Sequence, residues 1–147
     1  DVVAQHQDSP GPQEAAQEKG VYSIGYNTDM SRFAPKSHLT APVWNWAPYY
    51  AKVVEQVKTG TWKAGADWPG LAEGVVDLAP FGPMVPKPVQ DKVMAKKAEI
   101  INGKEKIFVG PIKDQQGAVR YAEGVVAPDQ DLLSMGWFVQ GVVGGVE

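Results

Sequence analysis

The pattern of hydrophobic and polar positions changes along this chain. Short apolar runs typical of strands are separated by longer segments in which apolar residues recur at helical spacing. Apolar and β-branched residues gather in "DVVA" (1–4) and in "VYSIGYN" (21–27). Between them, "PQEAAQEKG" combines helix-forming residues with Pro at its start and Gly20 at its end, which predicts a short helix. A strand, helix, strand order implies parallel strands with a right-handed crossover. The sequence therefore predicts an α/β fold with a parallel sheet flanked by helices.

Two longer helices are expected further along. The first covers "WAPYYAKVVEQVKTG" (46–60), with Asn45 as its cap and Gly60 at its end. Helical spacing places four of its apolar residues on one stripe: Tyr50, Val53, Val54 and Val57. The second covers "PKPVQDKVMAKKAEIINGK" (86–104) and has four apolar residues near one face: Val89, Val93, Ala98 and Ile101.

Strand-like runs separate these helices. They occupy "HLTAPV" (38–43), "GVVDLAPFG" (74–82) and "KIFVGPI" (106–112). The last run is expected to form a hairpin with "AVRYAEG" through the turn "KDQQG". A short capped helix is expected within residues 127–144, with apolar residues that dock against the fold: Leu132, Leu133, Trp137 and Phe138.

Composition excludes several classes of function. The 147 residues carry a net charge of −3 without a stripe of Lys and Arg, so nucleic acid is not an expected partner. The absence of Cys excludes disulfides, Cys-based zinc sites and a Cys nucleophile. No apolar run reaches the roughly 20 residues that span a bilayer. Because the chain begins on a strand-like run without Met, we expect it to be the C-terminal part of a longer protein.

Short polar side chains follow the first two predicted strands. They are Asp8 and Ser9 in "HQDSP", and Asn27 and Asp29 in "YNTDM". Ligands of parallel α/β sheets bind at the carboxyl ends of the strands, and these groups suit sugar hydroxyls or purine edges. Helix capping by Asp8 or Ser9 and Asx-turns at Asn27 or Asp29 remain an alternative.

Catalysis has thinner support. His6 and His38 lack the spacing of metal ligands, and the chain has neither a Gly-x-Ser-x-Gly elbow nor a dinucleotide fingerprint. We expect no metal and no cofactor. Asp8 and Asp29 could still form an acid/base pair.

The stretch "LTAPVWNWAPYY" (39–50) holds two Trp and two Tyr. Trp44 ends a predicted strand just before a helix, so its ring is expected to stack on a heterocycle near Asp8 and Asn27. The other large aromatic residues are expected to pack: Trp46, Tyr49, Tyr50, Trp62, Trp68, Trp137 and Phe138.

Five blocks together resemble the basic membrane lipoprotein family, the substrate-binding proteins of ABC importers that are similar to the purine nucleoside receptor. They are "QHQDSPGPQEAAQEKGVYSIGYNTDM", "LTAPVWNWAPYYAKVVEQVKTGTWK", "EGVVDLAPFGPMVP", "GPIKDQQG" and "LLSMGWFVQGVVG". The resemblance covers essentially the whole chain, but only the C-terminal part of a family member.

The resemblance implies part of a type I periplasmic-binding-protein fold, in which two α/β lobes close on a ligand. Residues 1–43 would form C-terminal-lobe structure and a hinge strand. Residues 44–73 would supply a helix and loop of the N-terminal lobe. Residues 74–147 would return across the hinge and complete the C-terminal lobe. The apolar stripe of the first long helix would then pack on a sheet outside these residues.

The resemblance also implies site residues. The strand-end Asp that binds ribose in related proteins falls at Asn27, with Asp29 as a possible substitute. Their glycine-rich loop falls on "HQDSPG", which carries His6, Asp8 and Ser9 here, and their cleft lysine falls near Trp44. These departures favour a purine base over its ribose.

The expected function is capture of a purine base or nucleoside between two lobes and its delivery to a membrane permease, without catalysis. Such a receptor would be periplasmic or a membrane-anchored extracytoplasmic lipoprotein. The missing lobe or a second copy of the chain would complete it. Two alternatives remain: a nucleoside hydrolase-like α/β enzyme that uses Asp8 and Asp29, and a ligand-sensing domain of the same fold.

Overall fold

The computed structural model describes residues 1–145 and divides the chain into two compact units, Asp1–Asn102 and Gly103 onward. The first unit contains β1 (Val2–Ala4), α1 (Gly11–Glu18), β2 (Tyr22–Ile24), β3 (His38–Thr40), β4 (Pro42–Trp44), α2 (Ala47–Lys58), β5 (Val76–Leu78) and α3 (Lys87–Ile101). The second contains β6 (Ile112–Lys113), β7 (Val119–Tyr121) and α4 (Asp129–Leu133). The boundary after Asn102 is not one that the sequence pattern predicts.

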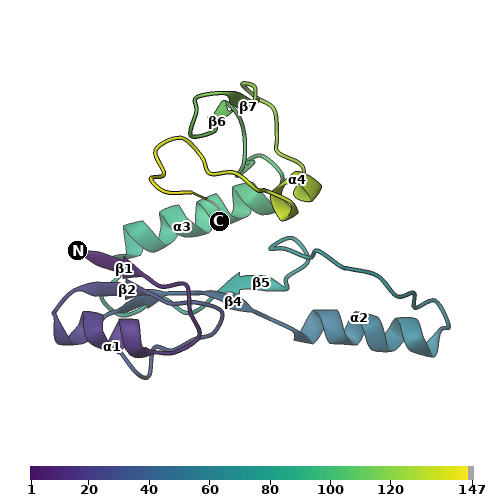
Figure 1. Ribbon diagram of the computed structural model, residues 1–147. Helices are drawn as coiled ribbons and strands as arrows, with labels where there is room; N and C mark the ends of the chain where they lie inside the picture. Colours follow the sequence, from purple (N-terminus) through teal and green to yellow (C-terminus); the bar gives the residue numbers. More distant parts are fainter. Residues whose placement is uncertain (146–147) are drawn as a thin grey trace. The chain divides into compact units, whose positions relative to one another are not determined.

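The first unit is built on a three-stranded parallel sheet in the order β1-β2-β3. Helix α1 connects β1 to β2 and packs against both strands (Figure 1), so the predicted parallel βαβ unit is confirmed. The surface between α1 and the sheet is made of small and polar side chains. Ala16 and Gln13 are buried in α1, and Ser23 is buried in β2. Small side chains bring the helix close to the sheet and leave room for a buried polar network.

The strand expected over residues 38–43 is in fact two strands. β3 continues the parallel sheet, whereas β4 leaves it and pairs antiparallel with β5, with Val43 opposite Asp77. The break falls at the buried Ala41 and at Pro42, which has no amide proton to continue a ladder. The antiparallel pairing means that the chain leaves along β4 and comes back along β5.

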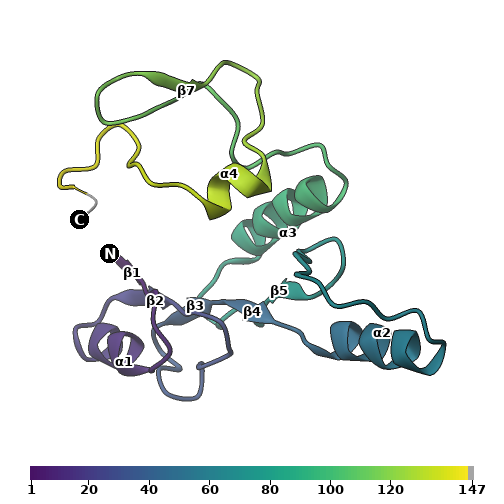
Figure 2. The same ribbon diagram turned by 45° about the vertical axis from the view of Figure 1, so that its right-hand side comes forward.

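Helix α2 extends away from the parallel sheet (Figures 1 and 2). None of its twelve residues is buried, and Tyr50, Val54 and Val57 are 60%, 58% and 61% exposed. The apolar stripe predicted from the sequence therefore exists, and it is open over most of its length.

The prediction that Asn45 caps α2 is wrong. The cap position is Trp46, which makes no side-chain capping bond. The Asn45 amide instead donates to the carbonyl of Gly74 at 3.1 Å, and its backbone N–H donates to Val75 at 2.7 Å. These bonds close the end of the β4–β5 pair, and that competing role explains why Asn45 is not the cap.

Helix α3 ends at Ile101, and Gly103 follows with a φ of 69°, as the sequence predicts. The predicted apolar face is only partly correct, because Val93 is half-buried while Val89, Ala98 and Ile101 are exposed. The half-buried Lys97 forms an ion pair with Asp77 of β5. The covered side of α3 therefore includes the charged Lys97 in place of Ala98 and Ile101. The apolar stem of Lys97 is largely covered, while its amine reaches Asp77.

The second unit contains the expected hairpin. β6 pairs antiparallel with β7, and Gly117 turns the chain with a φ of 83°. The buried Asp114 accepts hydrogen bonds from the N–H groups of Gln116 and Ala118. β6 is shorter than predicted, since residues 106–111 contribute only the bridge of Val109 to Val126.

The expected short helix near the end of the chain is α4. The ring centroid of Trp137 lies 6.4 Å from that of Tyr121, and the Arg120 guanidinium lies 5.3 Å from the Trp137 ring. Trp137 therefore docks as predicted, whereas Leu133 is 59% exposed. Within residues 1–145, no helix has the length and apolar character needed to cross a membrane.

Candidate functional site

Three of the residues that the sequence singles out are joined by side-chain hydrogen bonds. The amide nitrogen of Asn27 donates to Oδ1 of Asp8 at 3.3 Å, and Nε1 of Trp44 donates to Oδ1 of Asn27 at 2.8 Å. Asp8 follows β1, Asn27 follows β2 and Trp44 ends β4. We call this chain of contacts the Asp8–Asn27–Trp44 relay.

The backbone at Asn27 supports the same relay. Asn27 is the only non-glycine residue among those described with a positive φ, at 60°. Asn tolerates this left-handed conformation better than most residues. The carbonyl of Asn27 accepts the N–H of Trp44 at 3.0 Å, and Asn27 bridges to Val43 in parallel orientation. Backbone and side chain therefore fix β4 to the loop after β2 at one point.

The hydrogen bonds of the relay decide which groups remain available. The indole N–H of Trp44 is used internally, so Trp44 offers its ring faces and not its donor. Asp8 keeps free acceptor positions, because a carboxylate accepts at several lone pairs and only one contact is made to Asn27. The relay therefore presents an acceptor beside an aromatic face.

His6 and Ser9 lie in the loop that carries Asp8. The His6 ring packs edge-on against Tyr26, with ring centroids 4.5 Å apart. The Ser9 hydroxyl donates to Oε1 of Gln7 at 3.0 Å. Neither Asp8 nor Ser9 caps α1, whose cap position is Pro10 without a side-chain bond. The capping alternative is therefore wrong for both residues, because the loop turns their side chains to other partners.

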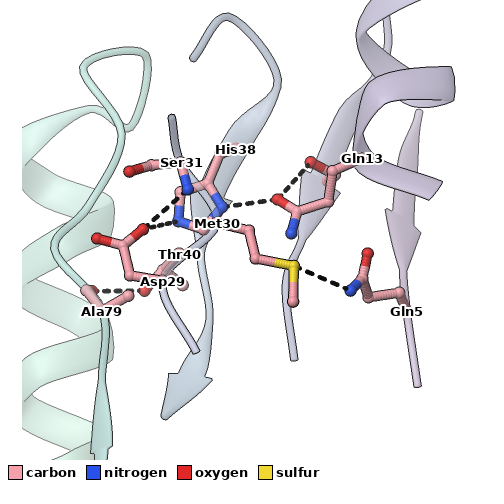
Figure 3. Close-up of polar contacts among 9 residues, drawn as sticks. Gln5, Gln13, Asp29, Met30, Ser31, His38, Thr40 and Ala79 are labelled. Atoms are coloured by element: carbon pink, nitrogen blue, oxygen red, sulfur yellow. Dashed lines mark hydrogen bonds and ion pairs between the residues drawn. The ribbon is translucent and has the colours of Figure 1, made fainter. Parts of the chain in front are cut away.

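Asp29 has a different role from the relay residues. Its Oδ1 accepts the N–H of Ser31 at 2.9 Å and lies 3.8 Å from Nε2 of the buried His38 (Figure 3). The bond from the Ser31 amide lowers the pKa of Asp29, and partial burial opposes it. The Asx-turn, which the sequence leaves open as an alternative to ligand binding, is thus present at Asp29. Asp8 and Asp29 have separate partners, which does not support a shared acid/base pair.

An aromatic groove adjoins Trp44. The rings of Trp44 and Trp46 stack at 5.6 Å with an interplanar angle of 23°, and Trp46 stacks on Tyr50 at 6.0 Å. A groove of about 430 Å³ is lined by Trp44, Trp46 and further residues of this unit: Tyr49, Asp67, Trp68, Pro69, Gly70, Val75 and Val76. A hydrogen bond to Asp67 raises the pKa of Tyr49.

Sequence reasoning missed part of this groove. Trp62 and Trp68 were expected to pack, but they are 51% and 66% exposed, so that expectation is wrong. Both lie in the irregular segment after α2, which supplies no core face. The clustering of Trp68 with the "VWNW" rings could have been inferred only from the antiparallel return of β5, which brings residues 67–70 back beside β4.

The described residues offer little for metal binding. Within residues 1–145, no group of three or more His, Cys, Asp or Glu side chains converges on a point where an ion could be held. The arrangement at the relay suits reversible binding of a flat molecule that carries N–H or O–H donors at its edge.

Comparison with known proteins places the chain in a family. Residues 1–116 match the family described as Bmp, the PnrA-like ABC transporter substrate-binding proteins. A purine-binding protein of Brucella abortus is 40% identical over 142 residues, which is 97% of this chain and 40% of that relative. A putative ABC transporter glucose-binding protein of Haloferax volcanii is 38% identical over 110 residues, 75% of this chain and 28% of that relative.

Solved structures show the same fold. A transcriptional activator of the comK gene from Bacillus halodurans has a TM-score of 0.63 at 24% identity, over 71% of this chain and 38% of that one. An ABC transporter solute-binding protein from Conexibacter woesei has a TM-score of 0.57 at 22% identity, over 72% of this chain and 36% of that one. The chain spans less than half the length of the curated relatives that it matches. Because the family match covers most of its residues, the chain belongs to the Bmp family of PnrA-like ABC transporter substrate-binding proteins.

Proposed function

We propose that this chain is part of the solute-binding component of an ABC importer and that it captures a purine base or nucleoside. The observation that carries the proposal is the Asp8–Asn27–Trp44 relay at the ends of β1, β2 and β4. It combines the Asp8 carboxylate, an acceptor, with the ring face of Trp44. The indole N–H of Trp44 is already bonded to Asn27. Trp44 is 45% exposed, with one side stacked on Trp46, so its opposite face serves as the ligand platform.

A purine fits this pair of groups chemically. Its flat ring stacks on an indole, a contact worth about 1–3 kcal/mol for bases on aromatic side chains. Its ring N–H and exocyclic amino groups are donors that a carboxylate such as Asp8 accepts. The purine-binding relative at 40% identity supports the same ligand class.

The remaining candidates have supporting roles in this proposal. His6 and Ser9 lie in the loop of Asp8 and contact a ligand that enters beside it. Asp29 fixes the turn that follows Asn27 through the Ser31 amide. The ribose that related proteins bind with a strand-end Asp would meet the neutral Asn27 here, so the base contributes more to affinity than the sugar.

The open face of α2 supports a two-lobe arrangement. We propose that residues 1–43 and 74–147 belong to one lobe and that residues 44–73 belong to the other. The antiparallel β4–β5 pair then carries the two passages between them. The second lobe, from further sequence or from a second copy, covers the stripe of Tyr50, Val54 and Val57. Closure of the two lobes is a hinge motion, and the contacts of the ligand with each lobe favour the closed state.

In this proposal the protein acts outside the cytoplasm, as a periplasmic receptor or a lipid-anchored one, and hands its ligand to a membrane permease. The family description supports the transport role. A ligand-sensing domain of the same fold is the alternative. Reconstitution with the permease in vesicles separates them, because only the receptor stimulates ligand uptake.

Calorimetric titration of the complete protein tests the ligand class directly. Adenine, hypoxanthine, adenosine and glucose are the probes, and glucose is included because one relative is named for it. We expect the purine bases to bind at least tenfold more tightly than glucose. Binding of glucose without binding of any purine would overturn the proposal.

The proposal includes no chemical step, and this separates it from a nucleoside hydrolase-like enzyme. In the structure, Asp8 contacts Asn27 and Asp29 contacts Ser31. Incubation with adenosine or inosine followed by chromatography should recover the nucleoside unchanged. Release of free base that disappears in Asp8→Asn would instead favour the hydrolase.

A further inference from the structure

A buried histidine connects helix α1 to the loop that carries Asn27. His38 is 1% exposed, and its Nδ1 lies 2.7 Å from Oε1 of Gln13 in α1. Figure 3 shows the ring between Gln13 on one side and Asp29 on the other. His38 is the first residue of β3, and its carbonyl lies so close to Gly82 that a Cβ there would meet it at 2.0 Å. The His38 ring is therefore held by Gln13, while close packing at Gly82 holds its backbone.

One nitrogen of this ring has no hydrogen-bond partner among the described protein groups. Because Oε1 of Gln13 accepts, Nδ1 of His38 carries the proton, and Nε2 of the neutral ring presents a lone pair. That Nε2 is buried without a partner and lies 3.8 Å from Oδ1 of Asp29. A lone pair that faces a carboxylate forms no bond, whereas a protonated Nε2 would donate to it.

The other groups around the ring are uncharged. Gln13 faces it from α1, and the Ser23 hydroxyl of β2 lies within the same network through Gln13 at 3.4 Å. Ser37, next to His38, donates to Ser23 at 3.0 Å. Within residues 1–145, Asp29 is the charged group within ion-pair distance of the ring. Protonation of His38 therefore changes one charge interaction above all others, the one with Asp29.

We infer that His38 and Asp29 form an acid-operated switch that sets the position of the Asn27 loop and, through it, the Asp8–Asn27–Trp44 relay. A charge-assisted N–H to carboxylate bond has a length of about 2.8 Å. Closing the gap from 3.8 Å to that length moves Asp29 inward by roughly 1 Å. Asp29 is two residues from Asn27, whose side chain holds both Asp8 and Trp44.

The local construction transmits such a movement. Asn27 already occupies a positive φ, and both its carbonyl and its side chain contact Trp44, so rotation of this loop changes the length of the Trp44 bond. Burial lowers the pKa of His38, and the Asp29 charge partly opposes this effect. The switch therefore operates in acid, below the ordinary histidine pKa of 6.5.

The inference concerns regulation of the proposed binding site, but its test needs no ligand. The ring signals of His38 and the indole N–H signal of Trp44 are followed by NMR from pH 8 downward, with Trp44→Phe for assignment. The indole N–H reports its bond to Asn27 directly. We expect both signals to shift with one shared midpoint, while the exposed Trp62 indole shows no such transition. If the site binds no purine, this result still stands, so the two proposals fail separately.

Two variants make the test specific. His38→Gln should remove the acid transition of the Trp44 signal. Asp29→Asn should shift the His38 midpoint to lower pH, because the attractive charge is gone, and should uncouple Trp44 from it. A Trp44 signal that stays constant while His38 titrates would overturn the switch. Persistence of the Trp44 transition in His38→Gln would also overturn it. Unfolding before His38 titrates would reject it as well.

Discussion

The indole N–H of Trp44 donates to the side-chain carbonyl of Asn27 at 2.8 Å, although the two residues are 17 positions apart in the sequence. The bond crosses from the end of β4 to the loop after β2. The bond uses the indole N–H, so Trp44 can meet a ligand only with its ring face. It also restrains the plane of the ring. The predictions about ligand binding depend on this relationship.

Replacing Trp44 by Ala removes the ring face on which a purine would stack. We expect affinity for adenine to fall by about 1–3 kcal/mol, the loss seen when bases lose an aromatic platform. Trp62→Ala is the matched control, because Trp62 is similarly exposed at 51% and lies outside the relay. Calorimetry on both variants gives the comparison. Equal affinities for the two variants would remove Trp44 from the site.

Two substitutions of Asn27 separate its backbone role from its side-chain role. Asn27→Gly tolerates the φ of 60°, whereas Asn27→Ala is strained there by about 1 kcal/mol. Both variants lose the bonds to Asp8 and Trp44, so we expect similar losses of affinity. Thermal melts should show Asn27→Ala as the less stable of the two. A more stable Ala variant would mean that the backbone at this position is not left-handed in solution.

Asp114 in the second unit provides a pH-dependent contribution to stability. Burial alone would raise the pKa of Asp114, but the amides of Ala118 and Gln116 and the Arg120 guanidinium together lower it. A carboxyl group with a lowered pKa stabilises the fold above its unfolded value of about 3.9, and this stability is lost as the pH falls.

We therefore expect the thermal stability of the wild-type hairpin to decline as the pH falls through this acid range. Asp114→Asn removes the charge but keeps an acceptor, so its stability should be lower at pH 7 and should change less between pH 6 and pH 3. Melting curves recorded at several pH values give the comparison. Parallel pH profiles for the two proteins would show that Asp114 contributes no titrating charge.

The exposed stripe on α2 predicts association of the isolated chain. Burying a large apolar side chain contributes about 1.5–3 kcal/mol, and Tyr50, Val54 and Val57 are all more than half exposed. We expect light scattering to show a dimer, or intact-mass analysis to show a retained partner chain. Val54→Lys should weaken the assembly, while Glu55→Lys, on the polar side of the same helix, should not. A monodisperse wild-type monomer would contradict the two-lobe proposal.

Local pattern was sufficient to predict several elements of the fold. The parallel βαβ unit follows from β-branched runs around a short helix, and the hairpin of β6 and β7 follows from "KDQQG". The long helices were found because stripes such as Tyr50 to Val57 repeat with helical spacing. In each case, the signal lies within a few residues of the element that it predicts.

Contacts between residues far apart in the sequence are harder to predict from local pattern. The split of residues 38–43 into two strands depends on Pro42 and on pairing with β5, which lies more than 30 residues later. Sequence pattern predicts a cap at Asn45 because its actual partner, Gly74, lies 29 positions away. Proximity of Asp8, Asn27 and Trp44 is expected from the strand ends, but the hydrogen bond from the Trp44 indole to Asn27 depends on side-chain orientations that the sequence pattern does not encode. The Asp29–His38 pair was not anticipated at all.

The most direct test of the account is to identify the molecule that the complete protein carries. The protein is purified from its own cells without added ligand and denatured, and the released small molecule is identified by mass spectrometry. The account predicts a purine base or nucleoside, present in the wild type and strongly depleted in Trp44→Ala. A monosaccharide in its place, or a purine retained equally by Trp44→Ala, would contradict the account.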